Sequence, residues 1–328
     1  MKSSLPWVAL AAALLTSGST PAASGQAAAR TWFEQGKAAF QAGDDAKAIA
    51  DFDRAISADP AMVEAFAWRG DARNDLGDAT GALADYDRAI QLDPEYEYAY
   101  VARCDTKRAI GNDAGAMRDC NRAIRLAPDD DYAFARRGTL KIEMGDAAGS
   151  VADFDRAIQL NANSVDAYAG RCKARVRLGS YAAAIADCRR ALVLDADDED
   201  ALFSLALAEQ QSGALTKAIA DWNQLLLQHR DEPGGYYYRG LAYFAIGSDR
   251  LALQDLDRYV SLAPDDPDGY YHRALVRIKV GDPGDAVSDL REALRRYRIQ
   301  GDAAGMSDAA GLLRKIGASP SGGATPSR

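Results

Sequence analysis

The chain has few of the residues on which most metal sites and nucleophilic enzymes depend. Among 328 residues there are two histidines, His229 and His272, and four cysteines. A zinc site or a Cys–His nucleophile needs clustered ligands, and neither histidine has a partner at ligand spacing. Glycine motifs that bind phosphate are also absent. We therefore expect no cofactor, no metal site, no catalytic residues and no enzymatic activity.

Positive charge is also in deficit. Lysine and arginine number 39 against 48 aspartates and glutamates, which gives a net charge of -9. This balance disfavours nonspecific binding to nucleic acid or to an anionic membrane, so no nucleic-acid partner is expected. The apolar fraction of 48% and the charged fraction of 27% are typical of a folded chain.

Only one long apolar run is present, and it lies at the N-terminus. Met1 and Lys2 precede the run Leu5–Leu15, and small polar residues follow it. The run is too short to span a bilayer, and the pattern predicts a signal peptide over residues 1–24, cleaved after a frame of Ala22, Ala23 and Ser24. An uncleaved anchor or a disordered extension is the alternative. The prediction places the protein in the periplasm or outside the cell, without membrane insertion after cleavage.

A fixed internal period organises the rest of the chain. A glycine recurs every 34 residues without insertion, at Gly43, Gly77, Gly111, Gly145, Gly179, Gly213, Gly247 and Gly281. Such a period is the signature of a repeat architecture. We place the repeats within residues 25–300, and the eight units are residues 29–62, 63–96, 97–130, 131–164, 165–198, 199–232, 233–266 and 267–300.

Each unit has the pattern of two helices joined by a turn. Apolar or small residues at positions 4 and 8 and at 20, 24 and 27 follow helical spacing. The glycine at position 15 can adopt the left-handed conformation that ends a helix. The next residue is polar in seven units and can accept a bond from the first amides of the second helix.

These columns resemble those of the tetratricopeptide-repeat family. The matching residues are the aromatic at position 4, the small residue at 8, the glycine at 15, alanine at 20 and 27, and proline at 32, from Ala29 to Gln300. The resemblance, to an exported bacterial type of the family, implies an all-α, right-handed solenoid with an inner, concave face made by the first helix of each unit. Residues 301–317 are predicted to form a capping helix, since terminal repeats need a polar cover, and residues 318–328 a disordered tail.

Aspartate occupies position 23 of every unit, and arginine occupies position 7 of six. The arginines could bind a ligand, or each could pair with the aspartate of its own unit, where an arginine fork and a carboxylate can meet. Arginine at position 26, one turn from the aspartate, is a third partner to consider. We favour the pairs within units: Arg69–Asp85, Arg103–Asp119, Arg137–Asp153, Arg171–Asp187, Arg239–Asp255 and Arg273–Asp289.

The cysteines occur as two matched pairs at positions 8 and 24 of units three and five. They are Cys104 with Cys120 and Cys172 with Cys188. A pair of cysteines could simply replace the glycine and large residue found there in other units. However, no unit carries one cysteine alone, the number is even and export is predicted. These facts together favour two disulfides within units.

The family's best-known peptide site, a clamp for C-terminal carboxylates, uses lysine and asparagine at positions 5 and 9. This chain has no asparagine at position 9 and no lysine at position 5, so that site is absent. On the inner face, units two and three carry mostly polar residues, including Asp71, Asn74, Asp75, Asp105 and Arg108. Units six to eight carry apolar residues instead. We call the following residues the binding face: Phe203, Leu207, Tyr237, Leu241, Phe244, Tyr271, Leu275 and Ile278.

An apolar patch usually marks an interaction site, although packing between first helices would also explain it. The sequence therefore predicts a non-enzymatic scaffold that binds a protein or peptide on this face, with Tyr237 and Tyr271 as anchors. The alternatives are a multi-protein assembly or structural factor of the cell envelope and an accessory module of an enzyme complex. The pattern does not indicate an oligomeric state.

Overall fold

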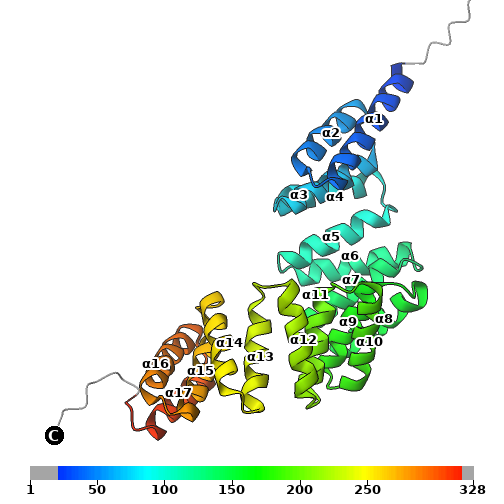
Figure 1. The fold of residues 1–328 in the computed structure, drawn as a ribbon. Coiled ribbons are helices and arrows are strands. Elements are labelled where there is room, and N and C mark those ends of the chain that lie inside the picture. Colours follow the sequence, from blue (N-terminus) through cyan, green and yellow to red (C-terminus); the bar gives the residue numbers. More distant parts are fainter. Residues whose placement is uncertain (1–20, 320–328) are drawn as a thin grey trace, which may run out of the picture. The chain divides into compact units, whose positions relative to one another are not determined.

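The computed structural model describes residues 21–319, and over those residues all regular structure is α-helical (Figure 1). It confirms the predicted all-α fold of helix-turn-helix repeats. Of the predicted signal peptide, residues 1–20 lie outside the described residues, and residues 21–24 are helical. Of the predicted tail, residues 318 and 319 are described, and residues 320–328 lie outside the described residues. Within the described range, no helix combines the length and apolar character needed to cross a membrane.

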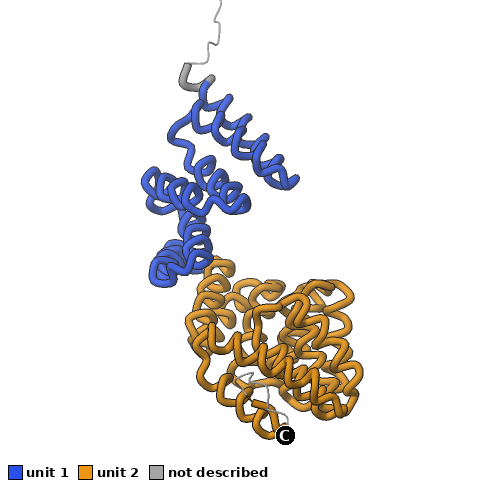
Figure 2. Tube along the Cα trace, turned by 90° about the vertical axis from the view of Figure 1, so that its left-hand side faces the viewer, with its two compact units in different colours: residues 1–128 blue, residues 129–328 orange. Residues whose placement is uncertain are grey.

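The helices divide into two compact units (Figure 2). In the first unit, described over residues 21–128, the helices are α1 (Pro21–Gln41), α2 (Asp45–Ala58), α3 (Val63–Asp75), α4 (Ala79–Leu92), α5 (Glu97–Ala109) and α6 (Asp113–Leu126). In the second, described over residues 129–319, they are α7 (Asp131–Glu143), α8 (Ala147–Leu160), α9 (Val165–Arg177), α10 (Tyr181–Leu194), α11 (Glu199–Gln211), α12 (Leu215–Gln228), α13 (Pro233–Ala245), α14 (Asp249–Leu262), α15 (Pro267–Val280), α16 (Pro283–Gln300) and α17 (Ala303–Lys315).

The periodic glycine makes the turn between the two helices of each repeat. All eight glycines have positive φ, from 72° at Gly179 to 87° at Gly213. Because L side chains rarely adopt this conformation, glycine is the residue that ends the first helix without strain. The spacing of this column therefore sets the register of all eight helix pairs.

The residue after the glycine caps the second helix in five repeats rather than in the seven that the sequence suggested. Asp44, for example, accepts a bond from the amide of Lys47 at 3.1 Å. Ser180 and Ser248 make no such side-chain bond. The prediction was wrong for these two serines, whose hydroxyls do not accept from the amides of the following turn.

Small residues at position 8 bring the two helices of a repeat together. In the second repeat, a Cβ added to Gly70 would lie 2.6 Å from the ring of Tyr86 at position 24. That ring is 1% exposed, so the absence of a side chain on α3 is what makes room for a buried aromatic on α4. The buried core is divided into clusters, several of which join residues of two successive repeats.

The last helix covers the end of the second unit. Ala309 and Leu313 of α17 are buried in one cluster with Leu290 and Leu294 of α16. The helix begins at the N-cap Asp302, which accepts bonds from two amides of its first turn. It thus protects apolar surface of α16 that would otherwise face solvent.

Candidate partner-binding face

The arginines at position 7 are held by aspartates of the repeats. In all six predicted pairs, Nη2 of the arginine lies 2.5–2.6 Å from Oδ1 of the aspartate. In each pair Nε also donates to Oδ2, at 2.8–3.0 Å. The result is a two-bond fork between the helices of one repeat.

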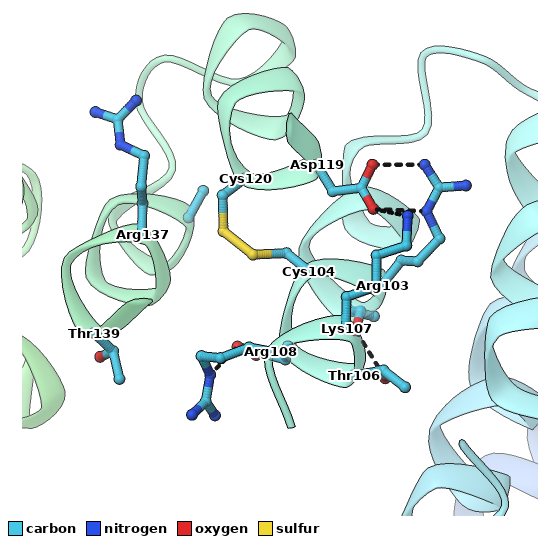
Figure 3. Close-up of a disulfide and its surroundings, with 12 residues drawn as sticks. Arg103, Cys104, Thr106, Lys107, Arg108, Asp119, Cys120, Arg137 and Thr139 are labelled. Atoms are coloured by element: carbon cyan, nitrogen blue, oxygen red, sulfur yellow. Dashed lines mark hydrogen bonds and ion pairs between the residues drawn. A yellow bond between two sulfur atoms is a disulfide. The ribbon is translucent and has the colours of Figure 1, made fainter. Parts of the chain in front are cut away.

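Further charges surround these pairs. Figure 3 shows Asp119 bonded to both Arg103 and Lys107, and Nζ of Lys107 lies 2.7 Å from Oδ2. Nη1 of Arg103 also reaches Asp87 of the preceding repeat at 2.5 Å. Burial opposes the charge of Arg103, but its bonds to the two carboxylates raise its pKa above the ordinary value. These arginines are therefore held within the repeats by carboxylates.

Arginine at position 26 has a different role in most repeats. Arg54 pairs with Asp51 at 2.8 Å in the first repeat, where position 7 is Gln35. The guanidinium also lies over the aromatic ring at position 4, as with Arg54, 4.6 Å from the ring centroid of Trp32, and Arg88, 5.9 Å from that of Phe66. The two arginine columns therefore hold that ring between them, since Arg69 lies 5.4 Å from the same centroid.

The four cysteines form two bonds within repeats. Cys104 and Cys120 are joined, with Cα atoms 5.6 Å apart (Figure 3). Cys172 and Cys188 are joined in the same way, with Cα atoms 5.4 Å apart. All four are fully buried. Each bond occupies the space that a ring and a glycine fill in repeats such as the second.

The eight residues of the binding face all lie half-buried in the second unit. Phe203 and Leu207 pack partly against the core around Trp222, and Tyr237 and Phe244 against the core around Leu256. Leu241 lies on α13 and Leu275 on α15. The structure therefore brings these residues to neighbouring first helices, while much of each side chain serves packing.

The two tyrosines differ in how firmly they are held. The Tyr237 hydroxyl lies 3.2 Å from Nδ1 of His272, and its ring centroid lies 4.9 Å from that of Tyr259. Burial, followed by the charge of Asp268, raises the pKa of Tyr237. Tyr271 instead packs against the cluster that includes α17. Tyr237 is thus a fixed part of the face, and Tyr271 connects it to the last helix.

A cavity of about 640 Å³ opens beside the binding face, between α9 and α11. Phe203 and Leu207 line it together with Val176. Carboxylates and basic groups also line it, among them Glu232 and Lys173. The repeat columns of the sequence did not predict that these charged residues lie together.

The polar residues of the second and third repeats mostly contact one another. Asp71 accepts bonds from the hydroxyls of Tyr86 at 2.8 Å and Tyr98 at 2.6 Å, and burial raises its pKa to about 6. Asn74 accepts from the Thr106 hydroxyl at 3.2 Å. Oδ1 of Asp105 lies 3.7 Å from Nε of Arg108.

Sequence reasoning missed an aromatic cluster in the first unit. Trp68 stacks on Tyr98, with ring centroids 6.4 Å apart, and meets Phe33 and Phe40 edge-on. Trp68 stands at position 6, a column that carried no repeating pattern. Its size relative to the other residues of that column was the only available signal.

A comparison with protein families matches the tetratricopeptide-repeat model over residues 8–63, 33–97, 136–201, 173–231 and 203–267. The chain belongs to this family. Proteins of the tetratricopeptide-repeat family generally act as non-enzymatic scaffolds that bind other proteins, and no catalytic family is indicated. The sequence matches none of the curated proteins with which it was compared.

Solved structures share the fold of this tetratricopeptide-repeat protein at low sequence identity. The APC/C hetero-tetramer Cut9-Hcn1 gives a TM-score of 0.68 at 16% identity, over 86% of this chain and 54% of that chain. This chain therefore spans about half the length of that protein. PilW, described as a type IV pilus biogenesis factor, gives 0.58 at 18% identity, over 62% and 94%. PilF of Pseudomonas aeruginosa gives 0.58 at 16%, over 69% and 99%.

The sixth repeat of this tetratricopeptide-repeat protein departs from the pattern of charges. In repeat six, position 7 is Leu205, and the buried Glu209 stands where most other repeats have lysine or arginine. Oε1 of Glu209 accepts a bond from Arg189 at 2.7 Å, whereas its buried Oε2 meets no N–H donor. Asp221, at position 23, faces Glu209 instead of an arginine fork. Burial, and then the charge of Glu209, raises the pKa of Asp221 to about 6.

Proposed function

We propose that this tetratricopeptide-repeat protein is a non-enzymatic scaffold that is exported from the cytoplasm and binds a protein or peptide on its binding face. The observation that carries the proposal is the concentration of half-exposed apolar and tyrosine side chains on α11, α13 and α15, next to a cavity. Tyrosine combines an apolar ring with a polar tip, which suits a partly hydrated interface. Among the residues described, no group of three or more acidic, histidine or cysteine side chains is placed to hold a metal.

Export is supported by the two disulfides. Disulfides persist in oxidising compartments and are rare in the cytosol. Protein isolated from its own compartment should therefore contain both bonds within repeats, and its N-terminus should lie near Gly25. Non-reducing peptide mapping by mass spectrometry measures both features, and four free thiols would contradict this part of the proposal.

The binding role is tested by crosslinking in the native compartment followed by mass spectrometry. Crosslinked partners should map to the binding face, and Tyr237→Ala with Tyr271→Ala should reduce their capture. Because both tyrosines also pack, a second pair, Leu241→Ser with Leu275→Ser, checks the same face at residues outside the core clusters. Circular dichroism establishes that each variant is folded.

A matched control removes apolar side chains from elsewhere in the second unit. Val193 and Leu227 are 74% and 70% exposed and lie on second helices. Val193→Ser with Leu227→Ser should leave capture unchanged. Undiminished capture by both binding-face pairs would overturn the proposal and direct attention to the first unit.

A structural role in the cell envelope is the second candidate. Its support is the likeness in fold to PilW and PilF, the first of which is described as a pilus biogenesis factor. Several partners crosslinked at once to separate faces would favour it over a scaffold with a single partner.

A further inference from the structure

The cavity between α9 and α11 has an apolar floor that includes Phe203 and Leu207. The ring of Phe203 meets Trp222 edge-on, with centroids 5.0 Å apart, and meets Tyr238 in the same way at 5.7 Å. A Cβ on Gly234 would lie 2.8 Å from the Phe203 ring, so the glycine leaves the ring room. Leu207 lies one turn further along α11. Such a floor is formed before any ligand arrives, which lowers the cost of binding.

Four carboxylates line the cavity, and they come from the starts of two helices. Asp198 caps α11 through a bond from the amide of Ala201 at 2.7 Å, and Glu232 caps α13 through the amide of Gly234 at 2.9 Å. Glu199 and Asp200 follow in the first turn of α11. Capping explains the presence of two of the four and engages one oxygen of each. It does not explain why all four border one apolar cavity.

The basic groups of the cavity do not balance this charge. Lys173 pairs with Asp200 at 2.9 Å, and Arg177 donates to the backbone carbonyl of Ile142 at 2.5 Å. Four carboxylates against two cations leave a surplus of two negative charges at the cavity. His229 lies 3.2 Å from Glu199 and adds positive charge only when it is protonated.

Neighbouring negative charges also act on the pKa of Asp198. Burial comes first among the causes that raise its pKa, and the negative charges of Asp200, Asp166 and Asp195 follow. A cation bound nearby would offset the repulsion between Asp198 and these negative charges. The cavity therefore offers an apolar floor for an uncharged side chain and a negative rim for a positive one.

We infer that the cavity is a docking site for a basic segment of the partner protein, in which an apolar side chain enters between α9 and α11 and a neighbouring lysine or arginine meets the rim. The inference rests on the proposed function and specifies the partner's chemistry. Charge complementarity at an interface mainly sets specificity and the rate of association. The family's clamp for carboxylates would select the opposite charge.

The test uses the full chain and three pools of fluorescent peptides with blocked ends. The first pool has a central leucine or phenylalanine flanked by lysine or arginine. The second replaces the basic residues by glutamate, and the third replaces the apolar residue by serine. In fluorescence anisotropy the first pool should bind at least about tenfold more tightly than either other pool, and its binding should weaken as salt is raised.

The matching variant carries Asp198→Asn, Glu199→Gln and Glu232→Gln. Asparagine and glutamine can still accept the bonds from the helix amides, so the caps remain while three charges are removed. Binding of the first pool should fall roughly tenfold, since each exposed charge contributes a modest share. The control removes three exposed charges elsewhere, with Glu95→Gln, Asp129→Asn and Asp308→Asn, and should bind as the unaltered chain does.

Equal binding of the three pools, no binding of the first pool, or full binding by the neutralised variant overturns the inference. If the variant loses helicity, the comparison of pools on the unaltered chain still decides. A separate outcome decides the proposed function. If a native partner crosslinks to the binding face and the neutralised variant still binds it, the scaffold role is supported and the docking of a basic segment is contradicted. Peptide binding without any crosslinked partner on that face would instead count against the scaffold.

Discussion

Repeats four and six place an aspartate at the same point of the second helix and give it opposite surroundings. In repeat four, Asp153 accepts the fork of Arg137 and lies 2.8 Å from Nζ of Lys141. In repeat six, Asp221 faces Glu209, and the charges of Arg189 and Lys217 lower its pKa less than the other causes raise it. Aspartate at position 23 thus stabilises repeat four and destabilises repeat six.

The largest effect is expected from removing the stabilising aspartate. Asp153→Ala leaves the guanidinium of Arg137 and the ammonium of Lys141 half-buried without their carboxylate, which should cost about 3 kcal/mol of unfolding free energy. Urea denaturation of the full chain measures the loss. Gln159→Ala, on an exposed site of the same helix, should change the free energy by less than about 0.5 kcal/mol. Equal effects of the two substitutions would show that the pair carries little stability.

A single substitution made in both repeats should act with opposite sign. Asp153→Asn removes the charge that binds two cations and should cost about 2 kcal/mol at pH 7. Asp221→Asn removes a like-charge contact with Glu209 and should be neutral or stabilise by up to about 1 kcal/mol. Hydrogen exchange of the amides in α8 and α12 reads the two repeats separately. A loss of protection in α12 as large as that in α8 would contradict the comparison.

The pH dependence of repeat six should follow the raised pKa of Asp221, which is about 6. The folded repeat holds this proton more tightly than the unfolded chain, so the stability gained at low pH is lost as pH rises from about 4 to about 6. Exchange protection in α12 of the unaltered chain, relative to the Asp221→Asn variant, should therefore decline over this range and level off above it. Taking the difference removes the contribution of Asp71, whose pKa is also about 6.

The smallest change in stability is expected from restoring the common charge pattern. Arg189→Asp in repeat five with Glu209→Lys in repeat six gives repeat six the charges that Asp87 and Lys107 supply around repeat three. The net charge stays the same, and the two new groups can still pair with each other. The pKa of Asp221, measured by NMR titration, should fall from about 6 to near its ordinary value of 3.8. A pKa that stays near 6 would assign the shift to burial alone.

The sequence predicted what depends on the period. The 34-residue spacing fixed the helix pairs because the left-handed glycine ends each first helix, and the sixteen-residue separation of arginine and aspartate placed the pairs now seen within repeats. Capping was overestimated at Ser180 and Ser248, since a hydroxyl in the capping column need not accept a bond. Periodicity describes what repeats have in common, and these serines depend on local geometry.

The features that distinguish individual repeats were harder to predict. Glu209 stands in a column that is otherwise mostly basic, and Arg189 in one that is mostly aspartate or asparagine, so the two exceptions could have been read as a reversed pair. Tyr237 shows what its position in the repeat does not predict. Its position places it on the inner face, but only the contacts with Tyr259 and His272 show how much of it is used for packing.

The disulfides have a consequence for how the chain responds to force. Each joins cysteines sixteen positions apart within one repeat. If the protein is pulled from its ends, the residues between the two sulfurs cannot extend, and each bond withholds roughly 50 Å of contour length at about 3.4 Å per residue. Repeats three and five would therefore lengthen in shorter steps than their neighbours, and a reductant would release the difference.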